Sequence, residues 1–336
     1  MILLDAPAWP AHGTLWSHLV SDTSLHELRT FARAAGVGDR AFDLDHYDTP
    51  ADRHAELVAA GAEPVDGRTL VRRLGASGLR VPGHERAGAR RDALRTRWQA
   101  LWQGLWADGR TGTDTTAAAA AVGDDLLERW SEPHRVYHGR LHLAAALDAL
   151  DTLLAETGTP AAQARTARLA VWFHDAVHEA GRADPGQAPT DTRPSGDGSG
   201  DGNDGGSDEE RSAALARHLL APLVATGALT ATDVEEVARL VLVTTDHAPD
   251  PDDLLGALVS DADLAVLGGT PARYSRYVHQ VRAEYGHVPD DLFRTGRAAV
   301  LEQLLALPRL FRTPAGHARW ATQAQVNLRA ELATRA

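Results

Sequence analysis

The doublet His174-Asp175 lies inside the segment RLAVWFHDAVHEA (168–180), where apolar residues flank it on both sides. Burying an imidazole and a carboxylate among such residues is unfavourable unless a partner compensates them. A divalent metal ion is one such partner, because it binds a neutral imidazole and a carboxylate as ligands. Two further candidate ligands are His142, in VYHGRLH, and Asp263, in LVSDADLAVLG. The sequence therefore predicts a metal site formed by these four residues.

Other ionisable side chains lie near these positions, and each has a simpler interpretation beside the functional one. His178 and Glu179 follow the doublet by four residues, so on a helix they share its face, but they equally suit a solvated helix end. His138 is a candidate ligand, a group behind the ligands or a surface residue. His247 ends a predicted helix, where a histidine often only complements the helix dipole. Asp261 precedes the candidate aspartate by two residues and points elsewhere, so only one of the two is expected to touch a metal.

Two other metal sites compete with this one. The run His-Asp-Ala-Val-His (174–178) is one methylene short of the zincin motif H-E-x-x-H, in which both histidines bind zinc. Asp175 is then the general base, and Glu209 or Glu210 the third zinc ligand. The shorter side chain would hold the base away from the water, and the other two candidate ligands stay unexplained. A calcium loop in the segment 181–207 lacks the Glu that the EF-hand pattern requires at its twelfth position.

Helices must position these residues, and helical periodicity dominates the chain after about residue 90. No stretch there is a comparable strand pattern, so residues 91–334 are predicted to form an all-α domain. The segment 181–207 interrupts it and is rich in Gly, Asp, Pro and Ser, a composition typical of disorder. Helices are predicted over 93–107, 115–130, 139–156, 161–180, 208–225, 231–245, 252–267, 271–285, 290–307 and 315–334.

Residues 1–82 alternate strand and helix patterns instead, and residues 83–90 have the composition of a linker. Such alternation favours a small parallel α/β domain. The predicted fold class is thus a small α/β N-terminal module followed by an all-α helical domain. In the module, strands are predicted over 2–6, 41–45 and 62–65, and helices over 24–36, 49–61 and 66–78.

Composition narrows the function. The chain has 336 residues and a formal net charge of −12, which argues against binding to nucleic acid or to anionic membranes. It contains no cysteine and no lysine, which excludes thiolate nucleophiles, cysteine zinc sites, Walker-type phosphate loops and Schiff-base chemistry. The sequence has no apolar run of about 18 residues, so no membrane span is predicted. The N-terminus lacks the pattern of a secretory signal, so we expect a cytoplasmic protein.

The region 90–334 resembles the HD-domain metal-dependent phosphohydrolase superfamily, whose pattern is a His, a later His-Asp doublet and a distant Asp. His142, His174-Asp175 and Asp263 match that pattern in order, and the resemblance favours Asp263 over Asp261 as the last ligand. The match is closest to a bacterial subgroup of predicted HD phosphohydrolases. It extends over the segments YHGRLHL, AVWFHDAVHE, DEERSA, SDADLAVLG, YSRYVHQVRAEY and FRTGRAAVLEQLL.

The resemblance implies a divalent metal cofactor (Mn, Fe, Co, Ni, Zn or Mg) and attack of metal-generated hydroxide on phosphorus. Glu179 is then expected to position the attacking water, and His178 or His247 to protonate the leaving oxygen. One departure concerns the substrate. Relatives that hydrolyse the alarmone ppGpp carry Glu-Asp after the doublet, whereas this chain has His178-Glu179, which argues against that alarmone.

The implied substrate is a nucleotide or another small phosphoester. Arginine donates two parallel hydrogen bonds to phosphate, so Arg211, Arg282 and Arg297 are the candidate substrate-binding residues, together with His138. Ordinary ion pairing on helix surfaces is the competing interpretation of each arginine. A domain that binds a nucleotide as a sensor, without turnover, is the alternative function.

Residues 1–82 resemble an uncharacterised small domain at MILLDAPAWPAHG, WSHLVSD, LHELRTFARAAG and LDHYDTP. No activity follows from that resemblance. Asp5 and Asp45-His46 are expected at carboxyl ends of strands, where open α/β sheets bind ligands. The polar residues of the module are either capping and turn residues or a second metal or nucleotide site. They are Asp5, His18, Asp22, His26, His46 and Asp48.

Overall fold

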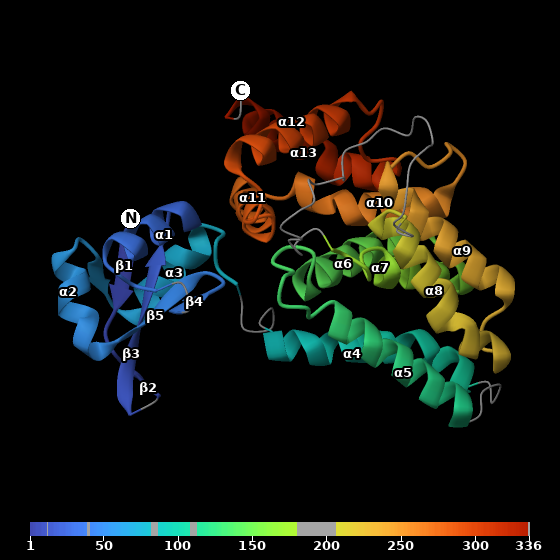
Figure 1. Cartoon of the computed structure of the whole chain (residues 1–336), viewed down its shortest axis with the longest axis horizontal. Helices are drawn as coiled ribbons and strands as arrows, with labels where there is room; N and C mark the ends of the chain where they lie inside the picture. Colours follow the sequence, from blue (N-terminus) through green and yellow to red (C-terminus); the bar gives the residue numbers. More distant parts are fainter. Residues whose placement is uncertain (12, 39–40, 82–86, 108–112, 180–205, 335–336) are drawn as a thin grey trace. The chain divides into compact units, whose positions relative to one another are not determined.

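In the computed structural model the chain forms two compact units (Figure 1). One unit is Met1–Arg86 with Thr270–His279, and the other is Ala87–Gly269 with Gln280–Ala336. The structure describes residues 1–11, 13–38, 41–81, 87–107, 113–179 and 206–334. The first half of the predicted linker (83–86) and the predicted disordered insert up to residue 205 lie outside the described residues.

The N-terminal unit is built on a mixed sheet with the strand order β4-β5-β3-β1-β6, and β2 pairs with β3 (Figure 1). The pair β1·β6 is parallel and the other pairs are antiparallel. The strands are β1 (Ile2–Asp5), β2 (Trp9–Ala11), β3 (Thr14–Ser21), β4 (Phe42–Asp43), β5 (His46–Pro50) and β6 (Glu63–Val65). The helices are α1 (Leu25–Ala34), α2 (His54–Ala59) and α3 (Gly67–Ala76), with a 3₁₀ turn at Ala51–Arg53.

An α/β module is therefore present, but its sheet is not the parallel one that we expected. The hairpin of β2 and β3 was not predicted as strands, and Gly13 in its turn has a φ of 78°, which glycine adopts at little cost. Thr49-Pro50 was predicted to begin a helix. Instead Thr49 pairs with Ser17 across β5 and β3, so the pairing between distant segments overrides a local capping signal.

Helices cover this sheet through apolar side chains, mostly leucines. Ser24 caps α1 by accepting a hydrogen bond from the Glu27 N–H, and Asp66 caps α3 in the same way. Leu28 of α1 and Leu57 of α2 are fully buried with Leu3 of β1. These contacts form a core of the unit's own.

The second unit is mostly helical, and its helices other than α4 begin within two residues of the predicted positions (Figure 1). The helices are α4 (Ala87–Ala107), α5 (Thr113–Arg129), α6 (Arg140–Thr157), α7 (Ala161–Phe173), α8 (Asp208–Ala225), α9 (Ala231–Leu242), α10 (Leu254–Leu264), α12 (Asp290–Ala306) and α13 (Pro314–Ala333). Helix α11 (Pro271–Glu284) contributes its first residues to the N-terminal unit and its last to this one. Helix α4 begins inside the predicted linker 83–90.

Tryptophan side chains fill the centre of the helical core. Trp98 and Trp102 of α4 are nearly inaccessible, and the rings of Trp98 and Trp172 lie 5.2 Å apart in an edge-to-face arrangement. The Trp98 indole N–H donates to the Ala119 carbonyl at 2.6 Å. A Cβ at Gly123 would overlap the Trp98 ring, so this glycine allows α4 and α5 to approach closely.

Helix α7 differs from its prediction at the end that matters most. We expected one helix over 161–180, but α7 ends at Phe173, directly before the His-Asp doublet. The Arg135 guanidinium donates to the carbonyls of Asp175 (2.6 Å) and Ala176 (3.1 Å), and Ser212 Oγ accepts from the Val177 N–H (3.0 Å). Side chains from elsewhere thus satisfy backbone groups after α7, which local periodicity cannot reveal.

Within the described part of the chain, no helix combines the length and the apolar character needed to cross a bilayer.

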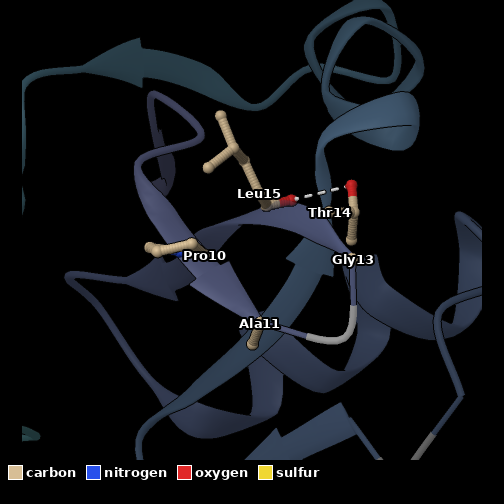
Figure 2. A pocket seen from close by; sticks show the side chains of 5 residues that line it. All are labelled: Pro10, Ala11, Gly13, Thr14 and Leu15. Atoms are coloured by element: carbon tan, nitrogen blue, oxygen red, sulfur yellow. Dashed lines mark hydrogen bonds between the residues drawn. The ribbon is translucent and has the colours of Figure 1, made fainter.

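The hairpin of β2 and β3 lines an open depression formed by Pro10, Ala11, Gly13, Thr14 and Leu15 (Figure 2). These side chains carry no ionisable group, so the depression offers nothing for catalysis or metal binding.

Candidate metal centre

Three helices of the second unit bring the predicted ligands together (Figure 1). His142 lies in the first turn of α6, and Asp263 lies in the last turn of α10. His174 is the residue directly after α7, and Asp175 follows it in the turn. Helices α6, α7 and α10 pack against one another, so the ends of three elements meet at one point.

The four side chains converge on a small polar volume. The Nε2 atoms of His142 and His174 lie 2.9 Å apart. Asp263 Oδ1 is 3.0 Å from Nε2 of His142 and 3.5 Å from Nε2 of His174. Asp175 Oδ2 is 3.5 Å and 3.2 Å from the same two atoms. Ligand atoms that share one ion at about 2.1 Å are separated by roughly 3.0–3.4 Å, so the spacing fits a metal ion.

The imidazole of His174 is oriented for this role. Its Nδ1–H donates to the Val171 carbonyl at 2.8 Å, so in the neutral ring Nε2 carries the lone pair that a metal requires. The ring of Trp130 packs beside it with centroids 5.4 Å apart, and the Trp130 indole N–H donates to Trp172 O at 3.0 Å. His174 is 1% exposed, so its ring is enclosed by the protein.

The electrostatics of the cluster are strongly coupled. Burial by itself would lower the pKa of His174, but the carboxylates of Asp175 and Asp263 outweigh burial and raise that pKa well above its ordinary value. Burial would raise the pKa of Asp263, but the two histidines hold it well below its usual range. Two imidazoles whose Nε2 atoms face each other beside two carboxylates form a donor set that a divalent cation satisfies completely.

Asp261 and Asp263 have separate environments. The carboxylate of Asp261 is fully buried and accepts the N–H groups of Arg312 (2.6 Å) and Thr313 (2.8 Å) and the Thr313 hydroxyl (2.6 Å). It thereby fixes the segment that leads into α13, which Thr313 caps. Asp263 is the member of the pair that faces the two histidines.

His247 lies next to the cluster. Its Nε2 is 3.6 Å from Asp263 Oδ2, and its Nδ1 is 3.1 Å from Ser260 Oγ. The residue has a φ of 55°, a left-handed backbone conformation that is unfavourable for residues other than glycine. Burial lowers the pKa of its ring, which therefore favours the neutral form. Interaction with the helix dipole alone does not explain why His247 lies beside a candidate ligand.

A second polar cluster surrounds Glu284 at the end of α11. Its Oε1 accepts from His138 Nδ1 (2.5 Å) and from His178 Nε2 (2.9 Å). Its Oε2 accepts the N–H groups of Val136, Tyr137 and His138 at 2.7–3.1 Å. Burial would raise the pKa of Glu284, but the two histidines hold it well below its usual range. The ring centroids of His138 and His142 lie 5.7 Å apart, so the Glu284 cluster adjoins the metal cluster.

Glu179 and Arg211 form a more exposed ion pair. The Arg211 guanidinium lies 3.0 Å from the Glu179 carboxylate and also bonds Asp208, while the Glu179 N–H donates to Asp208 at 2.9 Å. The Glu179 side chain is 48% exposed. These contacts place both residues at the segment after the doublet, and they engage the guanidinium that was expected to bind phosphate.

The other two arginines form ion pairs in the fold. Arg297 is 9% exposed, and two of its nitrogens each lie 3.0 Å from the Glu331 carboxylate of α13. Arg282 donates to the carbonyls of Tyr285 and Val288 and to Asp290 (2.6 Å). For both residues the structure favours the interpretation as structural ion pairs over that as phosphate ligands.

Two residues at the site were not predicted. Arg135 has a side chain only 1% exposed and holds the carbonyls of the doublet segment, and Glu284 joins His138 to His178. Glu284 does fall inside YSRYVHQVRAEY, one of the segments that carry the family resemblance, so a signal for it existed. Nothing in the periodicity around Arg135 distinguishes it from a surface arginine.

Comparisons with known proteins support only the N-terminal module. Residues 2–77 match the family model described as "Protein of unknown function (DUF4031)". No curated protein and no solved structure matches the chain. The helical unit is therefore interpreted from its own geometry.

Proposed function

We propose that the helical unit is an HD-type metal-dependent phosphohydrolase that acts on a nucleotide or another small phosphoester. The observation that carries the proposal is the convergence of His142, His174, Asp175 and Asp263 from three helices, with donor atoms 2.9–3.5 Å apart. These residues occur in the order that the HD superfamily pattern requires. The small α/β module is outside this proposal.

The donor set of two imidazoles and two carboxylates suits Mn²⁺, Fe²⁺, Co²⁺, Ni²⁺ or Zn²⁺, with Mg²⁺ a weaker match. When bound, such an ion supplies Lewis acidity, which lowers the pKa of water and polarises a phosphoryl oxygen. The protein's own part is to present neutral Nε2 atoms and ionised carboxylates in a fixed geometry. Val171 and Trp130 do so for His174.

Proton transfer to the leaving oxygen is assigned to the Glu284 cluster. His178 bonds an ionised carboxylate, and although burial by itself would lower its pKa, Glu284 and Asp175 raise it. A histidine that holds a proton near neutral pH is suited to act as a general acid. His247 lies 3.6 Å from Asp263 Oδ2, but burial lowers the pKa of its ring and favours the neutral form, so it suits this role less well than His178. Glu179 is left with water positioning, in competition with its pairing to Arg211.

The zincin alternative is weakened by the same contacts. It needs His174 and His178 on one metal, but His178 Nε2 donates to Glu284, and a different histidine, His142, faces His174. Helix α7 also ends before the doublet, whereas the zincin motif needs a continuous helix. A nucleotide sensor with the same metal site is the other alternative.

A turnover measurement tests the proposal. The full chain with added Mn²⁺ is incubated with a panel of nucleotides and small phosphoesters, and released phosphate or nucleoside is measured. We expect turnover by the wild type and a loss of at least about 100-fold in Asp175→Ala. The matched control is Asp291→Asn, an exposed carboxylate in the first turn of α12, which should retain full activity. Metal binding without turnover on any substrate would favour the sensor, and equal turnover by Asp175→Ala would contradict the site.

A further inference from the structure

Strand register gathers a second set of ionisable side chains in the N-terminal unit. In the antiparallel pair β3·β5, His18 lies directly opposite Asp48, and His46 precedes Asp48 by two residues. Successive side chains of a strand alternate between faces, so all three lie on the same face of the sheet. On the next strand, Leu4 pairs with Leu19, which brings Asp5 beside His18.

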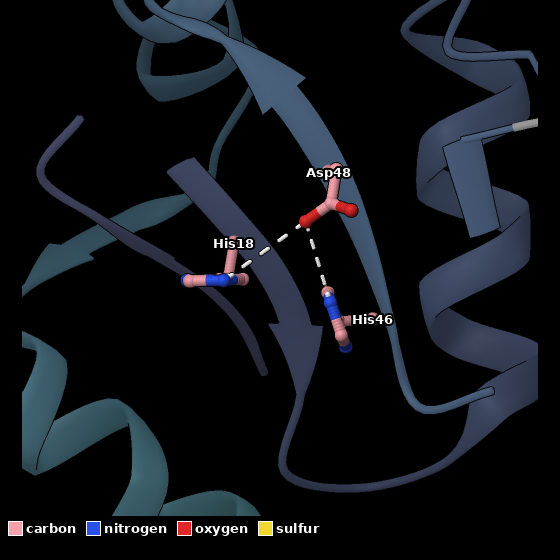
Figure 3. Close-up of side chains that lie close together, drawn as sticks. All are labelled: His18, His46 and Asp48. Carbon is pink, nitrogen blue, oxygen red and sulfur yellow. Dashed lines mark ion pairs between the residues drawn. The ribbon is translucent and has the colours of Figure 1, made fainter. Parts of the chain in front are cut away.

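The three side chains direct potential ligand atoms toward one another (Figure 3). Asp48 Oδ1 lies 3.3 Å from Nε2 of His46 and 3.9 Å from Nε2 of His18. The shorter separation matches the roughly 3.4 Å expected between two ligands of one tetrahedral ion, and the longer one is too long for a hydrogen bond. All three ligand atoms lie within 4.8 Å of one another.

Each imidazole is fixed from behind by a buried carboxylate. His18 Nδ1 donates to Asp5 Oδ2 at 2.8 Å, and His46 Nδ1 donates to Asp45 Oδ1 at 2.6 Å. Asp5 is 6% exposed and Asp45 is 1% exposed. A carboxylate on Nδ1 fixes the tautomer in which Nε2 has the lone pair, and it makes that nitrogen a stronger ligand. The same arrangement on two adjacent histidines is an observation independent of the three converging ligands.

The backbone in turn fixes both carboxylates. The His18 N–H donates to Asp5 Oδ1 at 2.5 Å, and the Val81 N–H donates to Asp45 Oδ2. Leu44, which precedes Asp45 in the turn between β4 and β5, has a φ of 60°, a conformation that a leucine adopts only under constraint. Buried carboxylates and a strained turn are unfavourable for stability, and a turn needed only to reverse the chain requires neither.

We propose that His18, His46 and Asp48 form a binding site for a first-row divalent metal ion, with Asp5 and Asp45 as positioning residues. Two imidazoles and one carboxylate are the ligand set of open Zn²⁺ and Fe²⁺ sites, which keep a coordination position for water or a substrate. The side chains of Asp48 and His18 are 45% and 27% exposed, so this position faces solvent. The site is separate from the helical metal centre and does not depend on it.

The test is a Co²⁺ titration of the full chain, followed by visible absorption and by metal analysis after dialysis. Asp48→Asn should bind one Co²⁺ fewer than its parent, and His18→Gln should behave alike. Asp45→Asn should keep the site but weaken it by about 10–100-fold, as loss of a positioning carboxylate does. Asp52→Asn, an exposed carboxylate just after β5, is the matched control and should bind Co²⁺ like the wild type.

The Asp48 side chain is half-exposed, so we expect Asp48→Asn to keep the fold even if the histidine variant unfolds, and thermal melting of each variant verifies this. The titration is repeated in an Asp175→Ala background, where the helical centre is disabled. The same one-equivalent loss in both backgrounds would support the N-terminal site whatever the outcome for the helical one. A folded Asp48→Asn variant with unchanged Co²⁺ stoichiometry and affinity would overturn it.

Discussion

At the scale of single residues, several histidines of the two candidate sites and of the Glu284 cluster have one ring nitrogen bound to a fixed acceptor. His174 uses the Val171 carbonyl, and His46 uses Asp45. His138 uses Glu284 in the same way. This arrangement converts a flexible titratable ring into a ligand or proton donor of defined tautomer. Three predictions follow from individual side chains.

Glu284→Gln tests the Glu284 cluster. The amide retains an acceptor for the three backbone N–H groups but removes the negative charge beside His138 and His178. We expect kcat to fall about 10–100-fold with Mn²⁺ content unchanged, because general acid catalysis is worth about 10²–10⁴-fold. The free energy of unfolding should fall by about 1–3 kcal/mol. Glu302→Gln, at an exposed position of α12, is the control. An unchanged kcat would remove His178 and Glu284 from catalysis.

Arg297→Met separates ion pairing from phosphate binding. Arg297 and Glu331 have side chains 8% and 4% exposed, so the substitution breaks a buried ion pair and takes the guanidinium away from the Glu331 carboxylate. Breaking such a pair costs about 3–5 kcal/mol, and urea unfolding should show a loss of that size. KM and kcat of the folded variant should match the wild type. A raised KM with intact stability would instead restore Arg297 as a substrate ligand.

Asp22→Asn tests a carboxylate that pairs with the terminal amino group and with Arg73. Burial would raise the pKa of Asp22, but the terminal amino group and Arg73 outweigh it and lower that pKa. Because the folded-state pKa is lowered, the ionised carboxylate stabilises the fold at pH values above the unfolded pKa of about 3.9. This contribution to stability is lost as the pH falls through the folded pKa. Wild type should therefore lose on the order of 1 kcal/mol more than Asp22→Asn when acidified below pH 4. Parallel acid profiles of the two proteins in urea unfolding would contradict this.

At the scale of elements, the segment after α7 is the decisive piece of local structure. Its carbonyls bind Arg135 and its Val177 N–H binds Ser212, so the doublet is held by two other segments rather than by its own helix. Arg135→Lys keeps the charge but loses the planar set of donors. We expect Mn²⁺ affinity of the helical centre to fall about 10–100-fold with helix content unchanged, as circular dichroism and calorimetric titration would show. Unchanged affinity would mean that the turn is stable without Arg135.

The elements also show what sequence alone can predict. Helices with strong caps were predicted closely: α8 begins after Ser207, whose side chain and that of Glu210 form a reciprocal cap. The end of α7 and strand β3 were missed, because contacts with distant segments contribute to both. His142 and Asp263 were candidate ligands from their own sequence context, and the resemblance added their order relative to the doublet and the choice of Asp263 over Asp261. Glu284 lies 146 residues from His138 in the sequence, so no local pattern connects the two.

At the scale of the whole molecule, each unit carries its own core and its own histidine-carboxylate cluster. The N-terminal set comes from adjacent strands in register, and the helical set comes from the ends of three helices. Different architectures thus present similar ligands, so we expect single substitutions to remove the two proposed sites separately.

The most direct test of the account is the metal stoichiometry of the full chain, measured by equilibrium Mn²⁺ titration of wild type and Asp263→Ala. The control is His218→Ala, which removes an exposed imidazole of α8. We predict that Asp263→Ala binds one Mn²⁺ fewer than wild type, while His218→Ala binds the same number. If Asp263→Ala is folded and binds as many ions as wild type with equal affinity, the four converging residues are not a metal centre.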